Sequence, residues 1–317
     1  MNTITRNALV SALILSPAYA MACASCGCTL SSDWDSQGFV TEPGLRLDLR
    51  YDYLNQSQLR SGTGSVNRSN YPAPQEREIE QGTKNNYLSL GLDYSPNADW
   101  GVNLQLPYID RSHSTIAPGD TEISSSHTKG IGDLRVVGRY QGLTDAKNMG
   151  LQFGLKLATG GYHNSFNGGP QAAQALDRGL QPGSGTTDLL LGAYTFGPID
   201  QRWDYFAQGL VQVALNSKEE YRQGSSLNVN FGVRYTAIDH LSPQLQINAR
   251  SAKRDAGLNA DADNSGGTLV YLSPGLTVSM TKQAKIFGFL QLPVYQKVNG
   301  FQLAPRWTAS VGVRYEL

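Results

Sequence analysis

The end of the chain carries the clearest pattern, Trp307-Thr-Ala-Ser-Val-Gly-Val-Arg-Tyr-Glu-Leu317. Every second residue is apolar, and the residues between them are small, polar or charged. Successive side chains of a β-strand point to opposite faces, so this stretch predicts a strand with one apolar and one polar face. A helix would scatter the same apolar residues around its whole surface.

The same alternation recurs through the chain and predicts about 12 strands in all. Links of a few residues alternate with longer loops along the sequence, and the longer loops cover 55–85, 111–130, 160–186, 217–224 and 253–267. The other predicted strands cover 45–53, 88–94, 100–108, 134–140, 151–157, 187–196, 205–213, 227–235, 245–249, 268–280 and 285–295.

An even number of strands with alternating short and long connections is typical of outer-membrane barrels, whose short turns face the periplasm. Aromatic residues also gather at the ends of the apolar strand faces, as at Trp100, Tyr108 and Trp203, where interfacial girdles lie in such barrels. The sequence therefore predicts an all-β fold, a transmembrane antiparallel up-and-down β-barrel in the bacterial outer membrane. A soluble β-sandwich or lipocalin-like barrel, which also alternates, is the other interpretation.

The composition excludes several other classes of protein. Of the 317 residues, 40% are hydrophobic and 16% are charged, and 26 basic residues balance 26 acidic ones. That balance argues against a nucleic-acid partner, and the 34 glycines argue against a coiled coil. The mean hydropathy of −0.34 disfavours a helical membrane bundle.

The first residues resemble a secretory signal. Arg6 supplies a positive charge, Ala8–Leu15 is a short apolar run, and small residues offer cleavage after Ala20 or Ala22. We therefore expect three parts, a signal peptide at 1–22, a cysteine-containing periplasmic segment at 23–40 and the barrel at 41–317.

All three cysteines of the chain lie in the short segment after the signal, at Cys23, Cys26 and Cys28. Clustered thiolates suit a soft ion, so a site for Cu(I) or Zn(II) is one interpretation. A single periplasmic disulfide with one spare thiol is another, and acylation of Cys23 beside a Cys26–Cys28 pair is a third. The metal interpretation carries an alternative function, a metal-handling or redox-linked outer-membrane scaffold.

If the apolar residues of each strand face lipid, the residues between them face the lumen. Charges there either pair with each other or select passing solutes. The bases outnumber the acids, which favours anions, whereas a ladder of internal ion pairs is the alternative. A barrel of this size lies between filled and open barrels, so an inward-folded loop or the N-terminal segment is expected to narrow it. The predicted lumen residues are Arg46, Asp48, Arg50, Asp52, Asp93, Arg135, Arg139, Lys156, Arg234, Arg250, Arg314 and Glu316.

Five short motifs occur along the chain, Gly130-Ile-Gly-Asp-Leu134, Gly183-Ser-Gly-Thr-Thr-Asp188, Tyr271-Leu-Ser-Pro-Gly275, Gln291-Leu-Pro-Val-Tyr-Gln296 and Val298-Asn-Gly300. They resemble an outer-membrane barrel family labelled for the meta-cleavage pathway of phenol degradation, whose members are called transporter-like proteins. The resemblance covers about 40–317 and implies an outer-membrane channel for small, often aromatic or apolar, organic compounds. The cysteine motif is not part of that pattern.

The expected function is a channel or transporter for small organic solutes, aromatic or anionic, and not an enzyme. Its expected partners are outer-membrane lipids, the solute and the barrel-assembly machinery, although Leu317 departs from the usual aromatic end of an assembly signal. An outer-membrane lipid hydrolase is a further alternative, but it requires a His beside a Ser on an outward strand face. His113, His127 and His163 fall in predicted loops and His240 in a predicted turn.

Overall fold

The computed structural model describes residues 42–317, which form one antiparallel sheet of 13 strands. Two short 3-10 helices, η2 (Arg68–Asn70) and η3 (Arg178–Leu180), lie in the connections. The strands are β1 (Gly44–Gly62), β2 (Gly64–Ser65), β3 (Ile79–Ser95), β4 (Trp100–Ile116), β5 (Ser124–Ile131), β6 (Leu134–Tyr140), β7 (Met149–Leu157), β8 (Asp188–Pro198), β9 (Trp203–Ala214), β10 (Ser226–Tyr235), β11 (Leu241–Ala252), β12 (Gly267–Ser279) and β13 (Ala284–Glu316).

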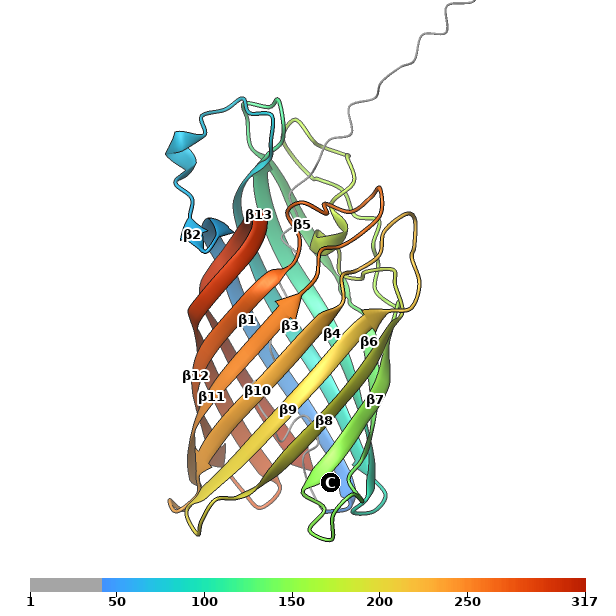
Figure 1. The fold of residues 1–317 in the computed structure, drawn as a ribbon, viewed down its shortest axis with the longest axis vertical. Coiled ribbons are helices and arrows are strands. Elements are labelled where there is room, and N and C mark those ends of the chain that lie inside the picture. The colour runs from blue at the N-terminus through green and yellow to red at the C-terminus, as the bar shows by residue number, and fades with distance from the viewer. Residues whose placement is uncertain (1–41) are drawn as a thin grey trace, which may run out of the picture.

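The sheet closes on itself into a barrel (Figure 1). β1 pairs with β3 on one side and with β13 on the other, in a register that sets Leu47 opposite Tyr315. Each remaining strand of the wall pairs with its neighbours in sequence. The prediction of an antiparallel up-and-down barrel is therefore confirmed.

The wall has twelve strand positions. Strand β13 supplies two of them, because its first part pairs with β12 up to Val298 and its second part pairs with β1 from Phe301. Strands β5 and β6 share one position, since both pair with successive parts of β4, and β2 is only a two-residue appendage of β1. The predicted number of strands is confirmed.

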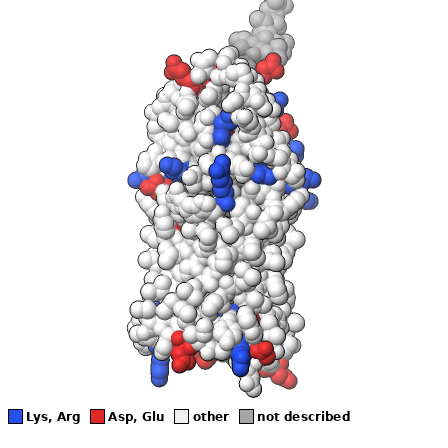
Figure 2. All heavy atoms as spheres, turned by 90° about the vertical axis from the view of Figure 1, so that its left-hand side faces the viewer, with Lys and Arg blue, Asp and Glu red and all other residues white. Residues whose placement is uncertain are grey.

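Apolar side chains cover the outside of the barrel and polar ones line its inside. Along β1, Leu47 and Leu49 are 38% and 44% exposed, whereas Arg46 and Asp48 between them are 2% and 5% exposed. Figure 2 shows the result on one face, a band without charged residues between two levels at which Lys, Arg, Asp and Glu gather. A band of this kind is the lipid-facing surface of a transmembrane barrel.

Residues 42–317 contain no helix long and apolar enough to span a membrane.

The two ends of the barrel differ. The short links, such as 96–99 and 280–283, lie at the end where the chain terminates, and the long connections lie at the opposite end (Figure 1). In outer-membrane barrels the short turns face the periplasm, so the long connections of this barrel face the outside of the cell.

Two predicted loops contain long stretches of strand. Strand β1 continues to Gly62 and β3 begins at Ile79, so about half of the predicted loop 55–85 belongs to the wall. Likewise β4 continues to Ile116 and β5 begins at Ser124, within the predicted loop 111–130. A spanning strand needs about 9–11 residues, so β1, with 19, extends well beyond the bilayer. Above the bilayer the outer face is polar and the alternation disappears.

The signal peptide predicted at 1–22 and the segment predicted at 23–40 lie outside the described residues. Their boundaries remain predictions.

Replacing Leu90 with arginine tests the position of the lipid-facing band. Leu90 lies on β3 opposite Leu49 and Leu106 of the neighbouring strands and is 52% exposed. At the bilayer midplane an outward arginine costs about 2–4 kcal/mol. We expect Leu90→Arg to lower the free energy of unfolding in phospholipid vesicles by that amount, as measured by urea titration.

The control is Ser112→Arg, at an exposed site on β4 above the band, where the cost falls to about 0–1 kcal/mol. Equal losses in the two variants would contradict the assignment of the band.

Candidate functional site

The inward face of the barrel carries the charged residues predicted for the lumen. Arg135 and Arg234 are half-buried there. The buried ones are Arg46, Asp48, Arg50, Asp52, Asp93, Arg139, Lys156, Arg250 and Arg314.

Near the periplasmic end these charges form a ladder of ion pairs across β1 and β13. The Nε of Arg314 lies 3.0 Å from Oδ1 of Asp48, directly opposite it in the strand register. One step lower, Nη2 of Arg46 lies 2.9 Å from Glu316 in the same way. Directly opposite pairs of this kind stabilise a sheet. Arg50 pairs along its own strand, with Nε 2.8 Å from Asp52.

Asp93 on β3 joins this ladder to the next strands. It receives both terminal nitrogens of Arg139 from β6, with the Nη2–Oδ1 distance at 2.9 Å, and Arg46 approaches to 3.6 Å. The guanidinium crosses β4 at Gly101, where a Cβ would lie 2.3 Å from Cζ of Arg139. Glycine at this position therefore leaves the space through which Arg139 reaches its carboxylate.

Other predicted lumen residues are paired as well. Arg234 lies 3.1 Å from Asp204, and Lys156 lies 2.8 Å from Asp188 on the adjacent strand β8. The alternative of an internal ion-pair ladder thus describes much of the predicted set. Selection of solutes by these residues remains a prediction.

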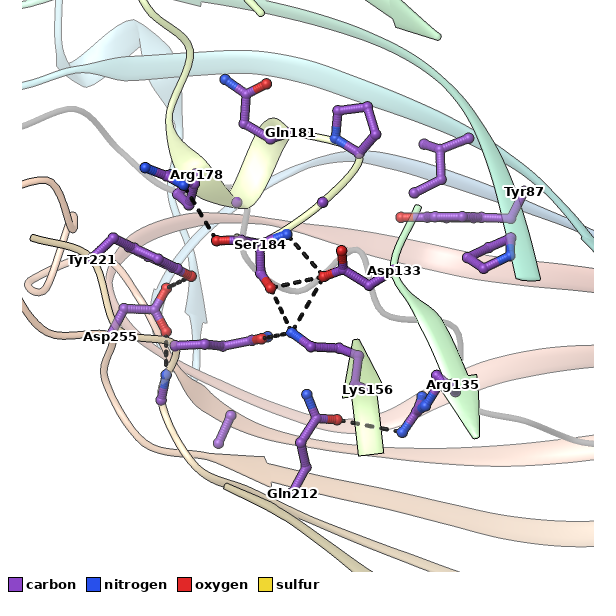
Figure 3. A pocket seen from close by; sticks show the side chains of 18 of the residues that line it. Tyr87, Asp133, Arg135, Lys156, Arg178, Gln181, Ser184, Gln212, Tyr221 and Asp255 are labelled. Atoms are coloured by element: carbon purple, nitrogen blue, oxygen red, sulfur yellow. Dashed lines mark hydrogen bonds and ion pairs between the residues drawn. The ribbon is translucent and has the colours of Figure 1, made fainter. Parts of the chain in front are cut away.

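Above the ladder the lumen contains a cavity of about 220 Å³ (Figure 3). It spans the barrel from β3 and β4 on one wall to β9 and β11 on the other, and Lys156 points into its centre among Ser184, Asp133 and Gln223. Its charged lining residues are Arg111, Asp133, Arg135, Lys156, Arg178, Arg250, Lys253 and Asp255.

The connection 158–187 folds inward and covers this cavity. Within it Phe166, Leu176 and Leu180 form a small hydrophobic core of their own. The connection crosses itself so closely that a Cβ on Gly183 would lie 2.3 Å from the carbonyl oxygen of Gly160. The expectation that a loop narrows the lumen is confirmed.

Arg111, Arg178 and Lys253 line the cavity but were absent from the predicted set. Arg111 continues the inward phase of β4 past Tyr108, so extending the alternation by a few residues would have found it. Arg178 and Lys253 lie in connections, where no periodic signal marks the residues that fold inward.

Two histidines do not lie in loops as predicted. His113 is inside the barrel on β4, where Nδ1 lies 2.8 Å from Thr83 Oγ1 of β3. His127 is on the outer face of β5, directly opposite Ser112 of β4, so a His does stand beside an outward Ser.

The neighbours of His127 nevertheless form an ion-pair cluster. Nε2 of His127 lies 2.8 Å from Asp110, and Lys129 lies 3.1 Å from the other oxygen of that carboxylate. Both partners lower the pKa of Asp110, His127 more strongly. Within the described chain Ser112 makes no hydrogen bond to His127.

The predicted copper or zinc ligands Cys23, Cys26 and Cys28 lie outside the described residues, and the metal site there remains a prediction. Between residues 42 and 317 no group of three or more His, Cys, Asp or Glu side chains could hold a metal ion.

No family model matches the sequence, and no curated protein matches it. Among solved structures, an outer membrane channel from Pseudomonas putida F1 is similar with a TM-score of 0.62 and 13% identity, over 88% of this chain and 97% of that chain. The translocator domain of the autotransporter NalP from Neisseria meningitidis is similar with a TM-score of 0.51 and 11% identity, over 89% and 92% of the two chains. At these identities the likeness shows a shared outer-membrane barrel fold.

Replacing Asp93 with asparagine tests the ion-pair ladder. The change leaves the buried guanidinium of Arg139 without its carboxylate, and breaking a buried pair in this way costs about 3–5 kcal/mol. We expect the urea midpoint of refolded Asp93→Asn barrels to fall accordingly.

The matched control is Asp99→Asn in a periplasmic turn, where the carboxylate lies 2.6 Å from Lys147 and both side chains are about a third exposed. Exposed pairs contribute about 0–1 kcal/mol, so this variant should unfold nearly as the wild type does. If the ion-pair ladder did not stabilise the barrel, Asp93→Asn and Asp99→Asn would lower the urea midpoint by the same small amount.

The carboxyl group of Asp177, at the start of η3, gives the covering connection a pH dependence. Burial raises its pKa well above the ordinary value, and the nearby carboxylates Glu78, Asp261 and Glu80 raise it further. The folded state thus favours the uncharged acid. The stability that the protonated Asp177 carboxyl contributes is complete below the ordinary pKa of an aspartic acid. It is lost as the pH rises through the raised pKa of the folded protein.

Limited proteolysis of 158–187 should therefore accelerate from acidic to alkaline pH, after correction with an unstructured peptide. In Asp177→Asn this acceleration should shrink, because the side chain stays uncharged. An Asp239→Asn variant, in an exposed periplasmic turn, should keep the wild-type profile. Identical profiles for wild type and Asp177→Asn would refute this role.

Proposed function

We propose that the protein is an outer-membrane channel through which small organic solutes cross the barrel lumen. The observation that carries this proposal is the cavity inside the lumen, which is bounded by opposite walls of a closed barrel. A polar inner face and a space large enough for a small organic molecule are what a solute pathway requires. The fold alone does not select this function, since autotransporter translocator domains share it.

The resemblance to the phenol-degradation family extends the proposal to small aromatic compounds. The lining of the cavity supports this extension, because Tyr87, Pro107, Ile109, Pro182 and Tyr221 give it apolar and aromatic surface. Charge selection by the ion-paired lumen residues also belongs to the proposal, as do contacts with outer-membrane lipids and passage through the barrel-assembly machinery.

We propose further that the outer face does not hydrolyse lipids. A serine nucleophile needs a base within hydrogen-bonding distance. In the described part of the chain, His127 is engaged with Asp110 and not with Ser112. Purified protein with calcium should release no fatty acid from phospholipid vesicles, and hydrolysis abolished by Ser112→Ala would establish the enzyme instead.

Solute flux into liposomes tests the channel directly. Vesicles containing the wild type should swell in small organic solutes, and planar bilayers should show discrete current steps. We expect Ser89→Trp, which adds an indole to the cavity wall, to reduce flux severalfold.

The matched control is Leu88→Trp, one residue away on the outer face, which should leave the flux unchanged. Folded wild-type barrels that give neither swelling nor current would overturn the channel proposal.

A further inference from the structure

The cavity in the lumen is strongly cationic for its size. Six basic residues line it, Arg111, Arg135, Lys156, Arg178, Arg250 and the exposed Lys253, against two acidic ones, Asp133 and Asp255. We propose that this cavity is a binding site for a small organic anion with an apolar body, such as an aromatic carboxylate. The inference rests on the proposed channel function and specifies the solute at its binding site.

The two carboxylates of the lining are occupied by protein donors. Asp133 accepts hydrogen bonds from the backbone of Gly160 at 3.0 Å and of Ser184 at 2.9 Å, and it lies 3.4 Å from Lys156. Asp255 accepts from the backbone of Gly224 at 2.7 Å and from the hydroxyl of Tyr221 at 3.0 Å. These bonds hold the covering connections in place. The lining still carries an excess of positive charge, because its six basic residues outnumber these two carboxylates.

Three of the bases make no ion pair with residues 42–317. Arg111 is held by neutral acceptors, the hydroxyl of Tyr87 and the carbonyl oxygen of Gly179, each at 2.7 Å. Arg250 donates to the amide oxygen of Asn228 at 3.0 Å. Lys253 lies beside the cavity at the end of β11. A guanidinium fixed by neutral acceptors keeps its full charge for a carboxylate, with which it makes strong charge-assisted hydrogen bonds.

Next to Arg111, the wall of β3 and β4 gives the cavity an apolar surface. Tyr87 and Ile109 are buried side chains of adjacent strands, and Pro107 and Pro182 complete this surface. In Figure 3 Tyr87 lies across the space from Tyr221 and Asp255. An apolar cavity of about 150 Å³ takes up benzene. A space of about 220 Å³ therefore has room for one aromatic ring with a carboxylate.

Benzoate, its uncharged analogue benzamide, and acetate separate the two requirements. Titration calorimetry on the full-length protein in detergent should show benzoate binding, with benzamide and acetate each about tenfold weaker or more, since each lacks one of the two contacts. Equal affinities for benzoate and benzamide would overturn the anion site. Equal affinities for benzoate and acetate would overturn the claim that the cavity binds the apolar part of the ligand.

A double variant, Arg250→Gln with Lys253→Gln, removes two of the cavity's charges and should weaken benzoate binding about tenfold or more. The control carries the same change in charge on the outer face, Lys84→Gln with Arg306→Gln, at exposed residues. It should bind benzoate as the wild type does. If the first variant does not fold, as judged by its heat-modifiable mobility, Arg250→Gln alone serves, because the side chain of Arg250 is buried and hydrogen-bonds to the neutral amide of Asn228. Unchanged benzoate affinity in the folded cavity variants would refute the proposal.

Conductance of potassium chloride through the same preparations separates this inference from the channel function. If the barrel conducts but does not bind benzoate, the proposed anion site is refuted and the channel proposal stands. If the barrel binds benzoate but passes no current, the channel proposal is refuted and the anion site stands as a receptor site.

Discussion

Pairing between β1 and the end of β13 is the constraint on which the rest of the structure depends. In the hydrocarbon layer no water is available to backbone N–H and C=O groups, so a sheet that crosses it must have no free edge. Closure gives every spanning strand one face toward lipid and one toward the lumen. Leu49 and Arg50, neighbours in sequence, therefore lie in opposite environments, one 44% and the other 9% exposed.

The same separation explains how charge is distributed along the lumen. Near the periplasmic end the inward charges are matched, as between Arg314 and Asp48. An unpaired buried charge there would cost several kcal/mol. At the other end of the lumen, Arg111, Arg250 and Lys253 make no ion pair within residues 42–317, and the strands and connections around them enclose a cavity. The ion pairs of the lower lumen thus stabilise the wall, and we propose that a solute meets charge in the upper lumen.

Much of the fold could be predicted from sequence, because lipid imposes a period of two on every spanning strand. The prediction failed where lipid ends. From Asn55 to Gly62 all side chains of β1 except Leu59 are polar or absent, so strand and loop have nearly the same composition. Most charged lumen residues within the predicted strand ranges were found from their phase, and Arg111 lies just beyond such a range. Arg178 was not, because its position depends on the packing of Leu176 and Leu180 in the covering connection. His127 was also missed as an outward strand residue, because β5 lies above the band, where the apolar–polar alternation is absent.

Nitroxide scanning along β10, in protein whose cysteines are replaced by serine and which is reconstituted in phospholipid, tests the central claim most directly. The account predicts that collision with oxygen, which concentrates in lipid, peaks at Leu227, Val229, Phe231 and Val233. It should be lowest at the alternate positions Asn228, Asn230 and Gly232, with a strict period of two. Uniform values, a helical period or maxima at the alternate positions would contradict an apolar outside and a polar inside.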